Sequence, residues 1–261
     1  MQYLKLRENR PHWNDWPPML LYGKNPILER IRANPQSLQE IYVRAGAKLP
    51  ELLKAAQDQG LRISELPVRE FEKLEAGVHS QGVLAQVASF KYADYEALLN
   101  ADPKLCLVFL DRITDPQNLG AILRTTACFG GFAVVLPKHD SVEVTEAVLR
   151  VANGGENYVP VALVTNLVQS VELAKKAGYW IGGAATAGGQ SLDQTGILSP
   201  AAIVFGSEGR GIRPGLEKHL DYCFSIPMAG AGLSLNVAVA AAIVCYEVCR
   251  QLGRRDGSHG T

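Results

Sequence analysis

The chain has 261 residues, no net formal charge and an apolar content of 47%, and these values exclude several classes of protein. Its length favours two compact units, and no apolar run approaches the length that a membrane-spanning helix needs. A neutral chain does not coat nucleic acid through bulk positive charge, although a local basic patch is compatible with it. The first 18 residues lack the apolar stretch of a secretory signal, so we expect a cytoplasmic protein without membrane contact.

The first part of the chain alternates short helical and strand-like segments. Helices are predicted for residues 25–33 and 50–59, and strands for residues 40–44 and 82–87. We therefore expect residues 1–88 to form a small α/β unit.

The region from residue 105 to residue 255 has a different pattern. Continuous apolar runs of strand length lie at residues 105–110, 132–136, 158–164, 179–184, 201–205 and 222–226. Helical segments separate these runs, which is typical of a parallel sheet covered on both faces, with ligands bound beyond the carboxyl ends of its strands.

Two further segments complete the expected domain organisation. Residues 89–104 show no strong hydrophobic period and contain Pro103 near their end, so we place a linker there. Residues 256–261 are polar and rich in glycine, and we expect them to form a flexible tail.

The five cysteines do not form a metal or redox motif. Their number is odd, and no two of them make a C-x-x-C pair. Cys245 and Cys249, on one predicted helix, lack the accompanying histidine or second cysteine pair that a metal site needs. We therefore expect buried structural thiols and no bound metal.

A first segment that carries chemistry follows the predicted strand at residues 105–110. It reads D-R-I-T-D-P-Q-N-L-G-A-I-L-R and ends at Arg124. Asn118 lies near a predicted helix start, where helix capping is the structural alternative to a functional role. Arg124 lies in an apolar stretch, where an arginine is costly unless it meets an anion or an internal ion-pair partner.

A second segment, I-V-F-G-S-E-G-R-G at residues 203–211, ends a predicted strand in three glycines around one acid. Glycines at such a point let the main chain come close to a ligand. The spacing is not the dinucleotide fingerprint and no P-loop lysine follows, which argues against a nucleotide-dependent oxidoreductase. A surface ion pair with Arg210 or Arg213 is the structural alternative for Glu208.

A third segment continues from the last predicted strand and reads I-P-M-A-G-A-G-L-S-L-N-V at residues 226–237. An alanine-rich helix follows it and is predicted to run to Leu252, with Gly253 as its stop. Ser234 is a candidate N-cap for that helix, which is its structural alternative.

In combination, these three segments resemble the SpoU-type RNA ribose 2′-O-methyltransferases of the SPOUT superfamily. The resemblance rests on N-L-G through Arg124, G-S-E-G at residues 206–209, and I-P-M followed by S-L-N-V. The layout is most similar to that of the 23S rRNA guanosine 2′-O-methyltransferases. The segment L-Y-G-K-N-P-I-L-E at residues 21–29 resembles the opening of the family's RNA-binding unit.

The resemblance implies a deep trefoil knot in the carboxy-terminal unit, S-adenosyl-L-methionine as the cofactor, and RNA bound by the amino-terminal unit. It implies that main-chain groups of Gly206, Ile226 and Leu235 hold the cofactor. Arg124 is placed at the reacting ribose, either as a base assisted by a substrate phosphate or as a phosphate clamp, and both roles stay open because a guanidinium normally keeps its proton.

The same resemblance implies roles for further residues. Asn118, Ser234 and Asn236 are assigned to substrate positioning, and Glu208 to holding the glycine loop or orienting Arg124. A homodimer is implied, with the apolar helix at residues 235–252 as a candidate contact. Candidate RNA contacts are Arg44, Lys48, Lys54, Arg62, Arg112 and Arg124.

Three points are left open. The family's G-V-H-Q-G motif has one extra residue here, as G-V-H-S-Q-G, so His79 is a candidate either for RNA contact or for a surface turn. The two-unit layout favours ribosomal RNA as the substrate, with transfer RNA as the alternative. A catalytically inactive RNA-binding assembly factor is the alternative to an enzyme.

Overall fold

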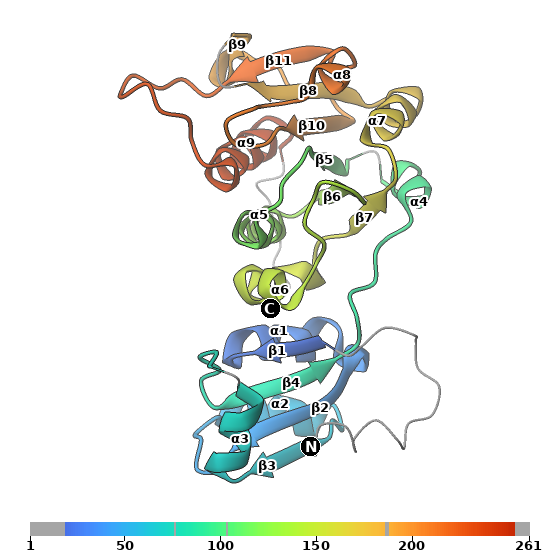
Figure 1. The fold of residues 1–261 in the computed structure, drawn as a ribbon. Helices are drawn as coiled ribbons and strands as arrows, with labels where there is room; N and C mark the ends of the chain where they lie inside the picture. Colours follow the sequence, from blue (N-terminus) through green and yellow to red (C-terminus); the bar gives the residue numbers. More distant parts are fainter. Residues whose placement is uncertain (1–18, 76, 103, 186–187, 254–261) are drawn as a thin grey trace.

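A computed structural model describes residues 19–75, 77–102, 104–185 and 188–253 of the chain. Figure 1 shows two stacked α/β units, with the amino-terminal unit below and the carboxy-terminal unit above. The predicted tail at residues 256–261 lies outside the described residues.

The amino-terminal unit is a four-stranded sheet with the strand order β1-β4-β2-β3. Its strands are β1 (Met19–Tyr22), β2 (Leu38–Arg44), β3 (Ile63–Leu66) and β4 (Val83–Val87). Its helices are α1 (Lys24–Ala33), α2 (Pro50–Asp58) and α3 (Val68–Glu75). The two predicted helices and two predicted strands of this unit are confirmed, whereas β1, β3 and α3 were not predicted.

The carboxy-terminal unit confirms the predicted α/β class with a parallel sheet. Its seven strands follow the order β7-β6-β5-β10-β8-β11-β9, and all of their pairings are parallel. They are β5 (Cys106–Leu110), β6 (Phe132–Pro137), β7 (Val161–Val164), β8 (Trp180–Ala185), β9 (Gln190–Ser191), β10 (Ala201–Phe205) and β11 (Tyr222–Ser225). The late strand β10 lies between β5 and β8, so the chain returns into the middle of the sheet; the knot itself stays a prediction.

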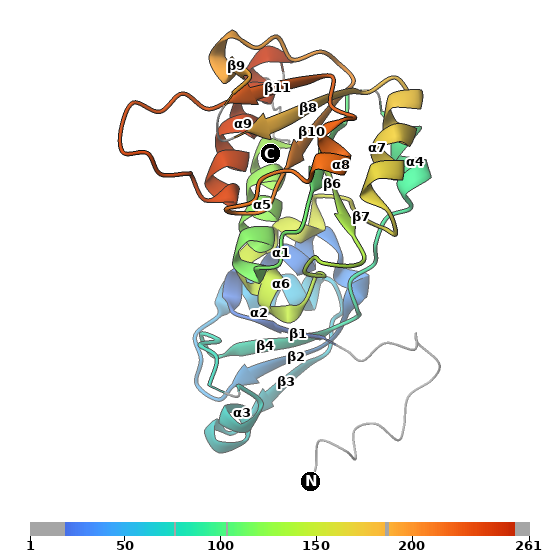
Figure 2. The same cartoon turned by 45° about the horizontal axis from the view of Figure 1, so that its top comes forward.

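Helices cover both faces of this sheet, as the continuous apolar strands predicted (Figure 2). They are α5 (Pro116–Phe129), α6 (Glu146–Ala152), α7 (Leu167–Lys176), α8 (Pro214–Glu217) and α9 (Val237–Gln251). Along β5, Cys106 and Val108 pack in one core with α5 and α9, whereas Leu107 and Phe109 pack in a second core with α7 and α8. Successive strand side chains therefore face opposite layers.

The predicted linker is not a simple connector. It contains the short helix α4 (Tyr95–Leu99), which begins where the Asp94 carboxylate accepts a hydrogen bond from the Ala97 backbone N–H at 2.8 Å. The buried Tyr95 hydroxyl donates to the Ser170 carbonyl of α7 at 2.6 Å. This segment is therefore packed against the carboxy-terminal unit.

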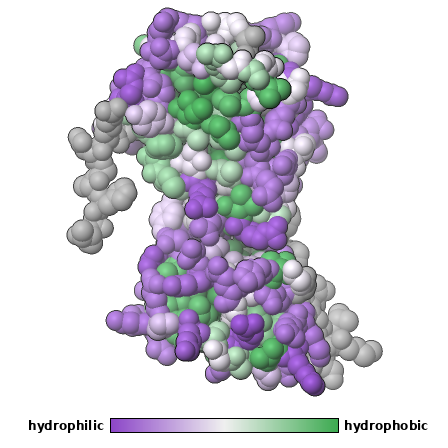
Figure 3. Space-filling model, turned by 90° about the vertical axis from the view of Figure 1, so that its left-hand side faces the viewer, coloured by the Kyte–Doolittle hydropathy of each residue, from purple (hydrophilic) through white to green (hydrophobic). Residues whose placement is uncertain are grey.

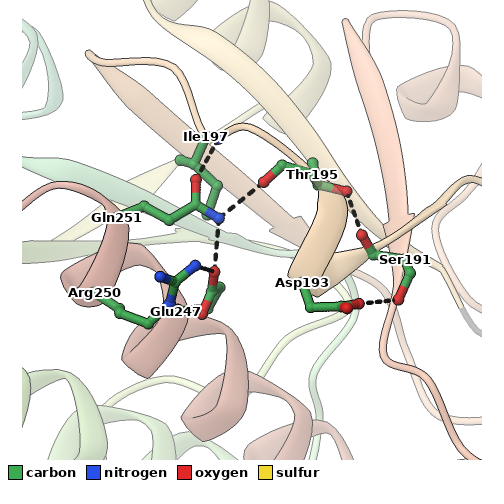
Figure 4. Close-up of polar contacts among 7 residues, drawn as sticks. All are labelled: Ser191, Asp193, Thr195, Ile197, Glu247, Arg250 and Gln251. Atoms are coloured by element: carbon green, nitrogen blue, oxygen red, sulfur yellow. Dashed lines mark hydrogen bonds and ion pairs between the residues drawn. The ribbon is translucent and has the colours of Figure 1, made fainter.

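The end of α9 is fastened to the segment that precedes β10 (Figure 4). The Gln251 side chain accepts a hydrogen bond from the Ile197 N–H and donates to the Thr195 carbonyl, each at 2.8 Å. Thr195 in turn donates from its hydroxyl to the Ser191 carbonyl of β9 at 2.9 Å. One glutamine thus connects the last described helix to the edge of the sheet.

We expect Gln251→Ala to lower the free energy of unfolding by about 1–3 kcal/mol, because it leaves two backbone groups of the Thr195 to Ile197 turn without their partners. Urea titration measures this change through the midpoint and slope of the transition. Gln169→Ala, at an exposed position of α7, is the matched control and should be nearly neutral. Equal stability of the two variants would contradict the fastening role.

Candidate functional site

The three segments singled out from the sequence meet at one edge of the carboxy-terminal sheet. They follow β5, β10 and β11, and carboxyl ends of parallel strands lie at the same edge. A cavity of about 320 Å³ opens there. Its lining includes all three residues predicted to hold a cofactor, Gly206, Ile226 and Leu235, together with Glu208 and Ser234.

The loop after β10 is folded too tightly for any residue but glycine at position 206. A Cβ atom there would lie 2.0 Å from the carbonyl carbon of Gly211 and 2.2 Å from the nitrogen of Ile212. Ser207 and Gly211 exchange backbone hydrogen bonds of 3.2 and 2.9 Å across the loop, and Gly211 has a φ of 64°. The glycines therefore place main-chain atoms, not side chains, on the wall of the cavity.

A buried carboxylate anchors the far end of this loop. Asp111, fully buried directly after β5, accepts hydrogen bonds from the Arg213 backbone N–H at 2.9 Å and from Arg213 Nε at 2.6 Å. Arg112 donates to the Gly211 carbonyl at 3.1 Å. The sequence analysis missed the role of Asp111, although a charged residue directly after a fully apolar strand was the available signal, and it considered Arg213 only as a partner of Glu208.

Glu208 joins the glycine loop to two helices. Its Oε1 atom accepts hydrogen bonds from Asn118 Nδ2 at 3.1 Å, from Asn236 Nδ2 at 2.7 Å and from the Val237 N–H at 3.5 Å. Asn236 also donates to Asn118 Oδ1 at 2.8 Å. The surface ion pair considered for Glu208 is wrong: among the described residues Glu208 forms no ion pair with Arg210 or Arg213, and Arg213 pairs with Asp111 instead.

The structure corrects two helix caps. Asp115 caps α5 by accepting a hydrogen bond from the Gln117 N–H, so the capping alternative for Asn118 is wrong. Asn236, not Ser234, caps α9 by accepting from the N–H groups of the following turn. Pro116 fits the first position of α5, which places the cap at Asp115 and leaves Asn118 one turn inside, buried and turned towards Glu208.

Arg124 lies on α5 outside this network. Its side chain is exposed, and among the described residues it has no hydrogen bond or ion pair. The structure therefore does not support an internal ion pair as the reason for this arginine, nor an orientation of Arg124 by Glu208. A free guanidinium on a helix that begins at the site is available to an external anion.

The cysteines fit the prediction in part. Cys106, Cys245 and Cys249 are buried, whereas Cys128 is exposed and Cys223 is half-buried. Cys223 lines the cavity, and burial raises the pKa of its thiol, so at neutral pH it shapes the wall and is not a nucleophilic thiolate. No group of metal-ligating side chains was found among the described residues.

The predicted RNA contacts fall into two sets. Those on the amino-terminal unit are exposed: Arg44, Lys48, Lys54, Arg62 and His79. Arg112 is half-buried, since it holds the glycine loop.

Within the described part of the chain, no helix has both the length and the apolar character to cross a membrane.

Both units match known protein families. Residues 105–246 match the model of the SpoU rRNA Methylase family, and residues 20–93 match the model described as RNA 2'-O ribose methyltransferase substrate binding.

Relatives match over most of the chain. A protein of Mycolicibacterium vanbaalenii named as an uncharacterized tRNA/rRNA methyltransferase is 38% identical over 241 residues, which cover 89% of this chain and 76% of the relative. The putative TrmH family tRNA/rRNA methyltransferase YacO of Bacillus subtilis is 32% identical over 236 residues, covering 88% of this chain and 94% of YacO.

Solved structures share the fold. A putative RNA methyltransferase of the TrmH family from Porphyromonas gingivalis superimposes with a TM-score of 0.74 and 26% identity, covering 96% of this chain and 94% of the other. The SpoU methyltransferase AviRb from Streptomyces viridochromogenes, solved with the cofactor AdoMet, gives a TM-score of 0.74 at 23% identity and covers 90% of each chain.

Proposed function

Because the chain belongs to the SpoU family of RNA methyltransferases, we propose that it methylates a ribose 2′-hydroxyl of ribosomal RNA in the cytoplasm. Methyl transfer to RNA with S-adenosyl-L-methionine as the donor follows from the family. The ribose position is supported by the match of the amino-terminal unit to a substrate-binding model of RNA 2'-O ribose methyltransferases. The observation that carries the proposal is the glycine-walled cavity, which the Glu208 network ties to the helix bearing Arg124.

The cavity fits the methyl donor in size and in chemistry. Its volume of about 320 Å³ lies in the range of small-molecule sites. We assign the main-chain groups of Gly206, Ile226 and Leu235 to holding the donor, which supplies an electrophilic methyl group when bound. A Cβ atom at position 206 would collide with the backbone of Gly211 and Ile212, so the path of this loop depends on glycine there.

Arg124 acts on the RNA side of the site. Its guanidinium offers five N–H donors in one plane, which suits bidentate binding of a phosphate. We propose that it clamps the phosphate next to the target ribose and stabilises the charge that develops on the attacking oxygen. Ser234 lines the cavity and is proposed to position the ribose. Asn118 and Asn236 are proposed to hold α5 and α9 against the glycine loop.

We expect Glu208→Ala to slow methyl transfer at least about tenfold, because hydrogen bonds to a charged acceptor contribute about 1.5–3 kcal/mol and the variant removes all of them. Glu208→Gln is the matched control. All three hydrogen bonds end on Oε1, so the amide oxygen of glutamine can replace that acceptor and should keep most of the rate. Single-turnover assays compare the two variants, and equal rates would contradict the role of the network.

A homodimer is proposed through α9. Val239, Ile243 and Tyr246 are exposed on this helix at the spacing of one face, with exposed fractions of 48%, 37% and 53%. Figure 3 shows the side of the molecule that carries α9, with apolar side chains gathered in its upper half. Contiguous exposed apolar surface of this kind marks contact sites.

Sedimentation tests this contact. We expect a dimer for the unchanged protein and a monomer with little activity for Tyr246→Asp, because a charge within an apolar contact disfavours association. Leu173→Asp alters an exposed leucine of α7 and should stay dimeric. A fully active monomer would contradict the proposed dimer.

Labelled methyl transfer tests the reaction itself. The protein is incubated with tritiated S-adenosyl-L-methionine and, in separate reactions, with ribosomal or transfer RNA from cells that lack it. A methyl group on the ribose oxygen removes the nucleophile for alkaline cleavage, so the label should be recovered in alkali-resistant dinucleotides from ribosomal RNA. Label in mononucleotides would refute ribose methylation, label in transfer RNA alone would refute the ribosomal target, and no transfer would favour the RNA-binding assembly factor.

A further inference from the structure

A short turn lies between the two units and touches both. The 3-10 helix at Gly155–Asn157 packs against α1 of the amino-terminal unit and against α5 of the carboxy-terminal unit. A Cβ atom at Gly154 would lie 2.5 Å from Glu29 Cβ on α1, and one at Gly155 would lie 2.8 Å from Arg124 Cα on α5. The turn therefore packs closely against both helices, and only glycine fits at these two positions.

Directional polar contacts fix α1 to this turn. Arg30 and Glu156 form an ion pair of 2.9 Å whose side chains are 5% and 0% exposed. Tyr158 donates from its hydroxyl to Glu29 at 2.7 Å. The backbone N–H of Leu20 donates to Glu146 of α6 at 2.6 Å, which adds a second connection between the units (Figures 1 and 2 show α1 next to α6).

The buried pair is poorly arranged for stability alone. Burial lowers the pKa of Arg30 and raises that of Glu156, while the charge of each partner offsets part of the cost of burying the other. Arg30 Nε, Glu156 Oε2 and Asn157 Oδ1 are buried without a hydrogen-bond partner among the described residues. Replacing a buried ion pair by apolar residues of similar size often leaves the stability of the protein unchanged or raises it. A buried ion pair can, however, favour one arrangement of the elements that carry it, because its hydrogen bonds are directional.

We propose that Arg30 and Glu156 are positioning residues that hold the RNA-binding unit at one angle to the helix carrying Arg124. The proposal rests on the proposed function of both units. The chain of contacts runs from α1 through Glu156 and Gly155 to the backbone of Arg124. RNA held by the amino-terminal unit would then present its ribose to α5 at a fixed distance, which is the condition for fast transfer between two bound reactants.

The test replaces the pair without leaving an unpaired charge. In Arg30→Met/Glu156→Leu we expect the midpoint of urea unfolding to stay at or above that of the unchanged protein and donor affinity to stay within about twofold. The turnover of RNA should fall about tenfold to a hundredfold, the range that a misplacement of about 1 Å produces. Small-angle X-ray scattering should show a broader distribution of distances between the two units. Arg69→Met/Glu72→Leu, which changes two exposed residues of α3 in the amino-terminal unit, is the control and should change none of these quantities.

Each outcome decides the proposal. Unchanged RNA turnover and unchanged scattering in a folded double variant would overturn it. If the double variant does not fold, Glu156→Gln, which keeps the shape of the side chain, is judged by the same two measurements. If the unchanged protein transfers no methyl group to RNA, the proposed function fails but the scattering result still supports or overturns the positioning of the units.

Discussion

Replacement of Arg124 by alanine or by lysine is expected to abolish RNA methylation almost completely, with rates lowered at least about a hundredfold. Alanine removes the charge, and lysine keeps it but cannot present two parallel N–H donors to one phosphate. Because the side chain is exposed and has no partner among the described residues, neither change should alter folding.

Single-turnover methyl transfer and donor affinity, measured on the same variants, separate the role of Arg124 from cofactor binding. Donor affinity should stay near that of the unchanged protein. Arg150→Ala, at an exposed arginine of α6, is the matched control and should retain its rate. Substantial turnover in either Arg124 variant would count against both the clamp and the base.

Gly206→Ala is expected to reduce the affinity for S-adenosyl-L-methionine at least about tenfold and the free energy of unfolding by about 1–3 kcal/mol. The added methyl group would lie 2.0 Å from the backbone of Gly211, so the loop must move away from its present path. The Glu208 carboxylate moves with that loop and loses its alignment with Asn118.

Calorimetric titration with the donor and urea unfolding measure these two effects. Gly215→Ala is the control, because a Cβ atom at this nearby glycine of α8 meets nothing within 4 Å. Donor binding by Gly206→Ala that equals the binding by Gly215→Ala would show that the glycine loop does not form the donor site.

The sequence predicted the elements with strong local signals. The buried strands β5, β6 and β10 are continuous apolar runs, and their alternation with helices indicates the parallel α/β class. The resemblance assigns Gly206, Ile226 and Leu235 to the cofactor, and the structure brings these three residues together at the cavity. Their binding of a donor stays a prediction.

Local signals were insufficient where several residues compete for one role. Asp115 and Asn118 are both good helix caps, and Pro116 favours the first of them. Ser234 and Asn236 compete in the same way at α9, and Asn236 both caps the helix and bonds to Glu208. Pro116 was therefore a usable signal at α5, whereas the choice at α9 depends on the position of Glu208, which a linear pattern does not give.

The contacts between the units were beyond sequence reasoning for a different reason. Arg30 and Glu156 are 126 positions apart, and neither stands in a sequence motif that marks it as buried. Their burial results from the packing of the two units against each other, which hydrophobic periodicity within one segment does not report.

The account depends most on where the methyl donor binds. A crystal structure of the protein with S-adenosyl-L-methionine should show the donor enclosed by the loops after β10 and β11, in contact with the backbone of Gly206, Ile226 and Leu235 and on the side of the sheet edge from which α5 begins. A donor molecule bound elsewhere on the chain, or a side chain that fills the cavity in the complex, would contradict the proposed donor site.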